Sequence, residues 1–355
     1  MRKTLSALSG GLGLLFASSA FAVPVTFNTF VSGADLSTSL GNAAAIGFAY
    51  AGDKFVGSVY FGANNNQLYQ TDLAGGNVAK FGTPIAGFSG EIYVSSSLGL
   101  GGFASRDVFA GSQFVNSIQQ FSNDGSSSST FASNLIGGVR GIAFDPYGQY
   151  GNKMLVTTGA GNVYQVDSAG NSTLLANVGG DAEGLDFTPQ QFGNIAAGTL
   201  VVVSEGTGRL TAIAADGTKV DLGLQFSVPE MLSFVPTNLG ISGNPLEGFY
   251  AAGYPSQVVK ADASQFASYL GDAVITDETN HHMYRIFWDT VSGKFMTSDI
   301  GLLPNQPEDG IFVTAAILNP GCGIRGNCGT VPEPSSIALF GIALVGMIYA
   351  GRRRS

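Results

Sequence analysis

Residues 139–146 read Val-Arg-Gly-Ile-Ala-Phe-Asp-Pro, and two related stretches follow them along the chain. Residues 184–189 read Gly-Leu-Asp-Phe-Thr-Pro, and residues 231–236 read Met-Leu-Ser-Phe-Val-Pro. Alternation of apolar and small residues around Phe144, Phe187 and Phe234 indicates a β-strand at each place. A strand that returns about every 45 residues predicts a repeat fold.

A β-hairpin with a polar, glycine-bearing tip is the second element of this repeat. Residues 163–167 read Val-Tyr-Gln-Val-Asp and precede Ala169-Gly170-Asn171, which is typical of a tight turn. The successive tips recur at a similar spacing, except for the last, and they carry Asp72, Asp124, Asp167, Asp216, Asp262 and Asp289. A hydrophobic strand, such as residues 200–203, lies between the two elements, so the unit is strand, strand, hairpin and strand.

This unit predicts an all-β chain folded as a β-propeller, with six blades because there are six hairpins. A β-sandwich or another β-repeat is the alternative. The last interval, from Asp262 to Asp289, is too short for a complete blade. We therefore expect the sixth blade to borrow a strand from the N-terminal or C-terminal region, unless the count is off by one. Residues 308–313, Glu-Asp-Gly-Ile-Phe-Val, fit the closing inner strand, and closure removes exposed sheet edges.

The stretch from residue 139 to residue 167 resembles NHL-type and gluconolactonase-like six-bladed propellers. The resemblance extends over most of the repeat region and consists of hydrophobic pattern and turns. In the lactonase-type relatives, acidic and amide residues at one mouth of the central channel hold a divalent metal. The resemblance implies a calcium site here, with oxygen ligands, from Glu91, Glu183 and Glu230. The amide ligands of the family are not evident at these positions.

Two further positions belong to the same pattern. Arg140 takes the place of the acidic residue in its own repeat, and we expect it to pair with one of the glutamates or with an anionic ligand. Glu308 or Asp309 is the next acidic position. The alternative is that these charges line a water-filled channel and bind nothing specific.

Both ends of the chain carry targeting signals. Arg2 and Lys3, an apolar segment and Ala20-Phe21-Ala22 form a secretory signal peptide over residues 1–22. Residues 331–355 combine Val-Pro-Glu-Pro, an apolar segment and a basic end, and they resemble the PEP-CTERM sorting signal. Its sorting motif is Pro332, Glu333 and Pro334, and its membrane stop is Arg352, Arg353 and Arg354.

The resemblance implies recognition by an exosortase-type processing protease. Residues 336–350 are expected to cross the membrane before processing, with the arginines on the cytoplasmic side. A permanent membrane anchor without processing is the alternative. The expected location of the protein is the cell envelope, the outer surface or the extracellular space.

Two cysteines, Cys322 and Cys328, bound a short loop just before this tail. Because an exported chain meets an oxidising compartment, we predict a disulfide between them. The predicted domains are thus the signal peptide at 1–22, the propeller at 23–318, a Cys-bounded linker at 319–330 and the sorting signal at 331–355.

Composition limits the function. Charged residues make up 12% of the chain and glycine contributes 51 of 355 residues, which disfavours long amphipathic helices. The net charge is −9, and five of the 16 basic residues lie in the terminal signals, so no basic patch is available for nucleic acid. No catalytic motif is present, so no catalytic residue is predicted.

We therefore expect an exported binding or scaffold module. By resemblance of the tail, it is linked to exopolysaccharide or a biofilm matrix, with extracellular polysaccharide as a partner. The alternative is a metal-dependent, lactonase-like hydrolase that uses the channel carboxylates.

Overall fold

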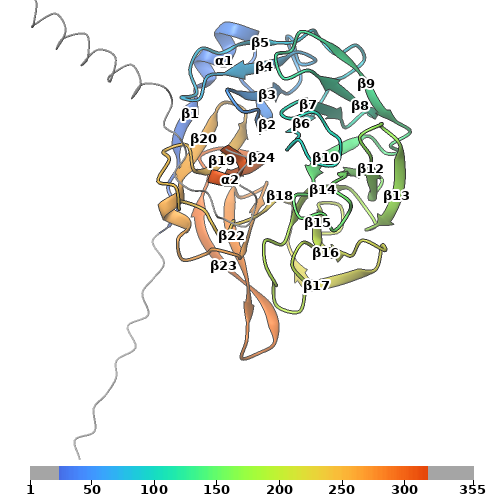
Figure 1. Ribbon diagram of the computed structural model, residues 1–355. Helices are drawn as coiled ribbons and strands as arrows, with labels where there is room; N and C mark the ends of the chain where they lie inside the picture. Colours follow the sequence, from blue (N-terminus) through green and yellow to red (C-terminus); the bar gives the residue numbers. More distant parts are fainter. Residues whose placement is uncertain (1–23, 319–355) are drawn as a thin grey trace, which may run out of the picture.

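A computed structural model describes residues 24–318 as a ring of six four-stranded antiparallel sheets around a central channel (Figure 1). The predicted six-bladed propeller is confirmed. The signal peptide, the two cysteines, the sorting motif and the predicted membrane segment lie outside the described residues. Within residues 24–318, no helix is both long and apolar enough to span a bilayer.

Four blades follow one another along the chain, and each has its first strand at the channel. Blade one contains β2 (Ala45–Tyr50), β3 (Phe55–Val59), β4 (Leu68–Thr71) and β5 (Ala79–Phe81). Blade two contains β6 (Ile92–Ser96), β7 (Val108–Ser112), β8 (Val115–Phe121) and β9 (Ser128–Ser133). Blade three contains β10 (Val139–Phe144), β11 (Met154–Thr158), β12 (Asn162–Val166) and β13 (Ser172–Asn177). Blade four contains β14 (Ala182–Phe187), β15 (Leu200–Ser204), β16 (Arg209–Ile213) and β17 (Lys219–Gln225).

The last two blades are interleaved in the sequence. Blade five contains β18 (Pro229–Phe234), β21 (Ala273–Asp277), β22 (His282–Asp289) and β23 (Lys294–Leu302). Blade six contains β24 (Gln306–Val313), β19 (Gly248–Tyr254), β20 (Val258–Asp262) and β1 (Asn28–Val31). The chain thus leaves blade five after its inner strand, builds the middle of blade six, and returns.

This interleaving explains the short last interval between hairpin tips. Asp262 ends β20 in blade six, whereas Asp289 ends β22 in blade five, so the interval does not measure one blade. The expected hairpin tip at Asp262 is wrong, because a 3-10 helix (η1, Ala263–Phe266) follows it. The outer neighbour of β20 is β1, from the N-terminal region. The expected closing strand at 308–313 is confirmed as part of β24.

The core lies between neighbouring blades. Every residue of the second strands β3, β7, β11 and β15 is buried, which accounts for their continuous apolar runs. Phe109 of blade two and Phe144 of blade three illustrate the packing, with ring centroids 5.3 Å apart. Two short helices complete the described chain, namely α1 (Gly33–Leu40) between β1 and β2, and α2 (Ala315–Leu318) after β24.

The glycine of the repeated motif is needed where inner strands approach each other. A Cβ atom at Gly141 would lie 2.5 Å from the Glu183 carbonyl oxygen, and one at Gly184 would lie 2.5 Å from the Leu232 nitrogen. No side chain fits at such distances, so the motif brings the inner strands of neighbouring blades into close contact.

Candidate functional site

The channel has two different ends, because all six inner strands run in the same direction along it. We call the end where they begin the carboxylate mouth. It is defined by Arg140 and seven acidic residues, Glu91, Asp181, Glu183, Glu205, Glu230, Glu278 and Glu308. We call the end where they finish the apolar mouth. It is defined by Phe144, Phe187, Phe234, Phe312 and the loops that follow these residues.

Irregular pairing at the start of the inner strands brings charged residues to the carboxylate mouth. The register of β10 with β11 shifts between Val139 and Gly141, and that of β14 with β15 shifts between Ala182 and Leu185. β18 and β24 show the same kind of shift. These shifts leave Arg140, Glu183, Glu230 and Glu308 out of the regular register, together with Gly184 and Met231. A bulge changes the direction of a side chain, so the same irregularity brings a charged residue to the carboxylate mouth in four blades.

Arg140 binds several acidic groups at once. Its Nη1 donates to Glu91, and its Nε donates to Asp181 Oδ1 at 2.8 Å. Its Nη2 lies 2.8 Å from Glu183 Oε1 and 3.8 Å from Glu205 Oε2. The Arg140 side chain is 12% exposed, so these charge-assisted contacts are shielded from water. The guanidinium thus neutralises one half of the carboxylate mouth.

The other half is held by an amide instead of a cation. Gln306 Nε2 donates to Glu278 Oε1 at 2.6 Å and to Glu308 Oε1 at 2.9 Å. Glu230 and Glu308 are each 5% exposed. None of the salt bridges found within residues 24–318 involves Glu230, Glu278 or Glu308. This half therefore has three carboxyl groups that form no salt bridge within the described residues.

Burial and mutual repulsion push these carboxyl groups toward the protonated form. Burial, followed by the charges of Glu278 and Glu183, raises the pKa of Glu308 to about 9. Burial and the charge of Glu183 raise the pKa of Glu230 well above its usual value. Burial also raises the pKa of Glu183 to about 7, although Arg140 opposes the shift. The mouth therefore retains protons at neutral pH.

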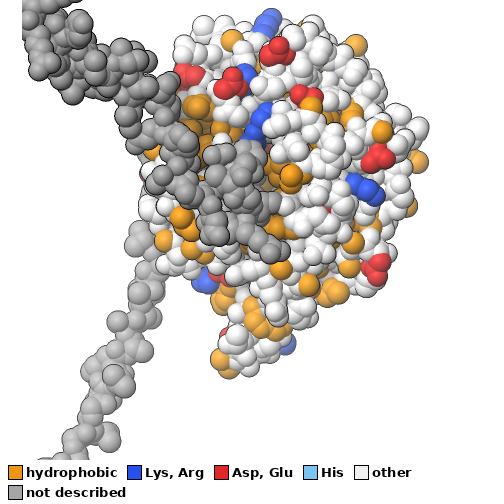
Figure 2. Space-filling model, viewed as in Figure 1, with side chains coloured by type: hydrophobic (Ala, Val, Ile, Leu, Met, Phe, Trp, Pro, Cys, Tyr) orange, Lys and Arg blue, Asp and Glu red, His pale blue; other side chains and the backbone are white. Residues whose placement is uncertain are grey.

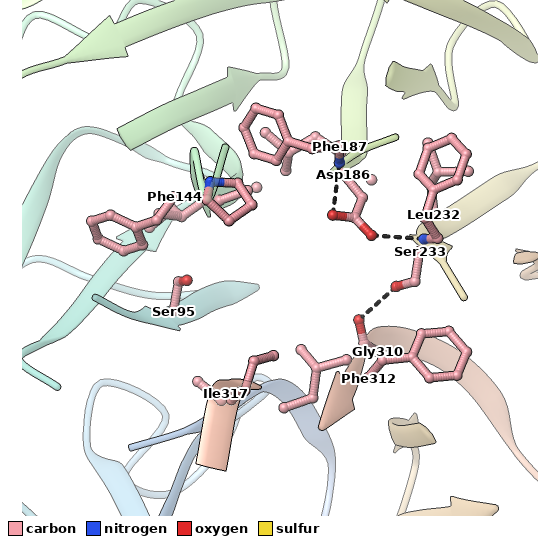
Figure 3. A pocket seen from close by; sticks show the side chains of 18 of the residues that line it. Ser95, Phe144, Asp186, Phe187, Leu232, Ser233, Gly310, Phe312 and Ile317 are labelled. Carbon is pink, nitrogen blue, oxygen red and sulfur yellow. Dashed lines mark hydrogen bonds between the residues drawn. The ribbon is translucent and has the colours of Figure 1, made fainter. Parts of the chain in front are cut away.

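A cavity of about 560 Å³ occupies the channel between the two mouths. Its wall at the apolar mouth includes Phe144, Phe187, Leu232 and Phe312, and Figure 3 shows them around the space. At its other end it reaches Glu183, Glu230 and Glu308, which we call the inner carboxylates. The cavity is thus apolar at one end and acidic at the other.

Two buried aspartates fasten neighbouring inner strands around this cavity. Asp186 Oδ2 accepts a hydrogen bond from the Phe234 N–H at 2.7 Å, which links blade four to blade five (Figure 3). Asp309 Oδ2 accepts one from the Phe48 N–H at 3.0 Å, which links blade six to blade one. Burial raises the pKa of each aspartate to about 7. These groups have structural partners, so they are weaker candidates for ligand contacts.

Helix α2 lies at the apolar mouth, directly after β24 (Figure 1). Its Ile317 side chain lines the cavity, and the Ile317 carbonyl accepts a hydrogen bond from Arg106 Nη2. Arg106 is 9% exposed and stacks on Tyr50 with its guanidinium carbon 5.2 Å from the ring centroid. The face seen in Figure 2 carries hydrophobic side chains around the middle of the ring.

Three exposed aromatic rings, Phe61, Phe114 and Tyr254, and the partly buried Tyr60 border the carboxylate mouth on blades six, one and two. The ring centroids of Tyr254 and Tyr60 are 5.6 Å apart, those of Tyr60 and Phe61 are 4.5 Å apart, and those of Phe61 and Phe114 are 6.1 Å apart. Phe61 is 50% exposed and Phe114 is 62% exposed. We call these four residues the aromatic row. Phe114 also borders a surface hollow of about 410 Å³ that reaches Arg140 and Asp181.

The residues expected from the sequence lie around this mouth. Glu91 and Glu183 both contact Arg140, and Glu230 follows Glu183 around the channel. Glu308, not Asp309, is the acidic group that β24 contributes here, because Asp309 binds the Phe48 N–H. The expectation that Arg140 pairs with a glutamate agrees with the geometry.

Sequence reasoning missed Asp181, Glu205 and Glu278. Glu205 follows the last residue of β15, and Glu278 follows the last residue of β21. These are equivalent positions, because each lies at the turn after the second strand of a blade. The equivalence of Glu205 and Glu278 is therefore present in the sequence, but it is visible only when the second strands of the blades are aligned instead of the first.

Comparisons with known proteins support the sorting signal and the fold. Residues 330–354 match the family model for the PEP-CTERM protein-sorting motif. This signal shows that the protein is exported to the cell envelope or beyond, and that an exosortase processes its C-terminus. No curated protein sequence matches the chain.

An X-ray structure described as a gluconolactonase candidate has 11% identity and a TM-score of 0.50, over 80% of this chain and 84% of that one. The similarity supports the six-bladed fold. A chain in a nidogen/laminin complex has 17% identity and a TM-score of 0.49, over 76% and 84% of the two chains. Virginiamycin B lyase from Staphylococcus aureus has 11% identity and a TM-score of 0.46, over 80% and 77%.

Proposed function

We propose that this protein is an exported binding module that holds an extracellular polysaccharide at the carboxylate mouth. The aromatic row is the observation that carries the proposal. Large apolar side chains that remain exposed side by side on a folded surface mark an interaction site. The row follows the rim through three adjacent blades, so it suits an extended ligand better than a compact one.

The chemistry of this rim matches a sugar chain. A pyranose ring presents C–H groups on its face, which pack against an aromatic ring, and hydroxyl groups at its edge, which donate hydrogen bonds. Phe114 offers a ring face, and Asp181 offers a carboxylate across the same hollow. Stacking and hydrogen bonding are therefore available to one ligand at once.

The charge of the mouth selects among polysaccharides. Seven carboxyl groups surround one arginine, and that arginine already contacts Glu91, Asp181 and Glu183. A uronic-acid polymer would meet like charge here. We therefore expect neutral polymers, or polymers with amino sugars, to bind more tightly than acidic ones.

Affinity electrophoresis of the exported protein in gels with dextran, glycol chitosan or alginate tests this proposal. We expect retardation by dextran or glycol chitosan and none by alginate. Replacing both Phe61 and Phe114 by alanine should weaken binding about tenfold or more, at about 0.5–1.5 kcal/mol for each aromatic contact. The control is Val291→Ala, at a side chain that is 94% exposed on the distant β22–β23 hairpin. Binding that survives the double substitution would contradict the proposal, as would binding to none of the three polymers.

A metal-dependent hydrolase is the second candidate, since one observation favours a cation. Carboxylate oxygens of Asp181, Glu183 and Glu205 lie within 4.8 Å of one another, and calcium prefers oxygen ligands. However, Arg140 contacts the same three groups. The site therefore does not fit a metal until the guanidinium leaves, and we derive no catalytic step from it.

Calcium calorimetry tests this second candidate on the wild type, Glu183→Ala and Glu230→Ala. A metal site built from Glu91, Glu183 and Glu230 predicts heat in the wild type that both substitutions abolish. No heat in the wild type would remove the calcium site, and with it this form of hydrolase. The polysaccharide proposal would be unaffected, because it is argued from the aromatic row and not from these carboxylates.

We also propose that residues 336–350 hold the C-terminus in the membrane until the exosortase removes the tail, and that a Cys322–Cys328 disulfide closes the linker at 319–330. Intact mass measurement of the exported protein checks both points. The expected product begins near residue 23, ends near residue 331, and is two hydrogens lighter than its reduced form. A full-length product would support the permanent anchor instead.

A further inference from the structure

The cavity of about 560 Å³ extends from the inner carboxylates to the apolar mouth, away from the aromatic row. A cavity of this size is within the range of about 300–1,000 Å³ that small-molecule sites occupy. Its wall at this end is formed by residues that include Phe144, Phe187, Leu232, Phe312 and Ile317, which Figure 3 shows around the space. Such a wall favours a molecule with an apolar body.

The floor of the cavity has the opposite character. Glu183, Glu230 and Glu308 line it, at 3%, 5% and 5% exposure. Glu230 shares a side-chain hydrogen bond with Glu183, Glu183 also contacts Arg140, which lines this end of the cavity, and Glu308 accepts from Gln306. Glu230 and Glu183 are therefore a buried pair of carboxyl groups that share a proton, and within residues 24–318 Glu230 makes no salt bridge.

Charge also sets the orientation of a ligand. Arg106 is the cation of the apolar mouth, where its Nη2 binds the Ile317 carbonyl. The inner carboxylates lie at the other end of the inner strands. Glu183 and Phe187 are four residues apart on β14, which is about 13 Å along an extended strand. A positively charged group is thus repelled by Arg106 at the rim, whereas at the floor it takes the place of the proton that Glu183 and Glu230 share.

We propose that this cavity is a second binding site, for a small molecule with an apolar body and one terminal ammonium group that reaches Glu230. The apolar body lies against the phenylalanines of the inner strands. The ammonium group supplies the cation that Glu230 and Glu308 lack. This site is independent of the polysaccharide site, because no residue of the aromatic row lines the cavity.

Three probes that differ in one end group test the proposal by calorimetry at pH 8. They are 4-phenylbutylamine, 4-phenylbutanol and 4-phenylbutyrate, which share the same apolar body. We expect the amine to bind, the alcohol to bind at least tenfold more weakly, and the acid to give no heat. Equal binding of amine and alcohol would overturn the role of the carboxylates, and no binding of the amine would overturn the site.

Two substitutions locate the site, and one separates it from the polysaccharide site. Glu230→Gln should abolish the preference for the amine over the alcohol. Ser95→Phe should weaken both probes, because Ser95 points into the cavity (Figure 3) and a phenyl ring would fill it. Phe114→Ala, at the other mouth, should leave amine binding unchanged. Amine binding that is insensitive to Ser95→Phe would contradict the location. The comparison of three probes on the wild type decides the question even if a variant fails to fold.

Discussion

The two mouths of the channel are built by the same six strands and yet differ completely in chemistry. Where the strands begin, bulged positions aim Arg140, Glu183, Glu230 and Glu308 at one another. Where they end, regular pairing resumes, and Phe144, Phe187 and Phe234 pair with the first residues of the second strands. Blade one has the same kind of shift between Ala45 and Phe48 but carries no charged residue there. The difference between the mouths therefore teaches that a bulge re-aims side chains, while the residue placed at the bulge decides the charge.

The largest effect is expected at Arg140. Arg140→Ala leaves Glu91, Asp181 and Glu183 without their cation, so the free energy of unfolding should fall by about 3–5 kcal/mol at pH 8. The loss should be smaller at pH 5, where the carboxyl groups are protonated. Urea unfolding at both pH values measures it.

The matched control is Arg209→Ala, which removes a surface pair with Asp221 whose side chains are 57% and 43% exposed. Its effect should stay below about 1 kcal/mol. Equal losses for the two substitutions would show that the carboxylate mouth behaves like ordinary surface.

The pH dependence of stability gives the next largest effect. Because the pKa of Glu308 is raised to about 9 in the folded protein, the native state binds more protons than the unfolded state between pH 4.5 and pH 9. The stability that Glu308 contributes is therefore fully present below its unfolded pKa of about 4.5, and it is lost as the pH rises toward 9. Glu308→Gln removes this contribution and should reduce the loss between pH 5 and pH 8 by about 3 kcal/mol.

Thermal unfolding across this pH range checks the change, with Asp53→Asn as the control, because Asp53 is 73% exposed and follows the end of β2, opposite the carboxylate mouth. The stability of the Asp53→Asn control should depend on pH in the same way as that of the wild type. A Glu308→Gln profile that also runs parallel to the wild type would mean that Glu308 is ionised in the folded state.

A smaller effect is expected at the apolar mouth. Asp186→Ala removes the acceptor of the Phe234 N–H and of the Phe187 N–H, so it should cost about 2 kcal/mol. Asp186→Asn keeps an acceptor oxygen and should cost less. Chemical unfolding of the two variants at pH 8, where Asp186 is ionised, distinguishes lost hydrogen bonding from lost charge. The reverse order would contradict the assigned link between blades.

The smallest effect is expected at the aromatic row. Phe114 is 62% exposed, so Phe114→Ala should change the free energy of unfolding by less than about 0.5 kcal/mol. The same variant should bind polysaccharide more weakly. A large loss of stability measured by urea unfolding would show that Phe114 belongs to the core rather than to a ligand surface.

Much of the fold was predictable from local chemistry. The hairpin tips were visible because aspartate binds the backbone of its own turn, as Asp167 Oδ1 does with the N–H groups of Ala169 and Asn171. The repeated glycine marked the places where inner strands meet. The acidic positions Glu91, Glu183 and Glu230 were visible because they stand at a nearly constant offset from a repeated strand.

Other features could not be predicted from residues that are neighbours in the sequence. β19 and β20 have the same apolar character as any inner pair of strands, so nothing in them shows that they leave blade five for blade six. Asp181, Glu205 and Glu278 join the carboxylate mouth from outside the repeated first strand. The aromatic row brings Tyr254 beside Tyr60, from segments far apart in the sequence, and ring closure alone makes them neighbours.

By itself, the sequence determined the export of this protein, its repeat and the offset of its acidic residues, because each of these depends on residues that are close together along the chain. The tertiary structure alone decided which strands share a blade, which acids share Arg140, and that the channel has one charged and one apolar end. The physical reason is that electrostatic pairing and burial depend on distances across the ring, and those distances are set only when the last blade closes on the first.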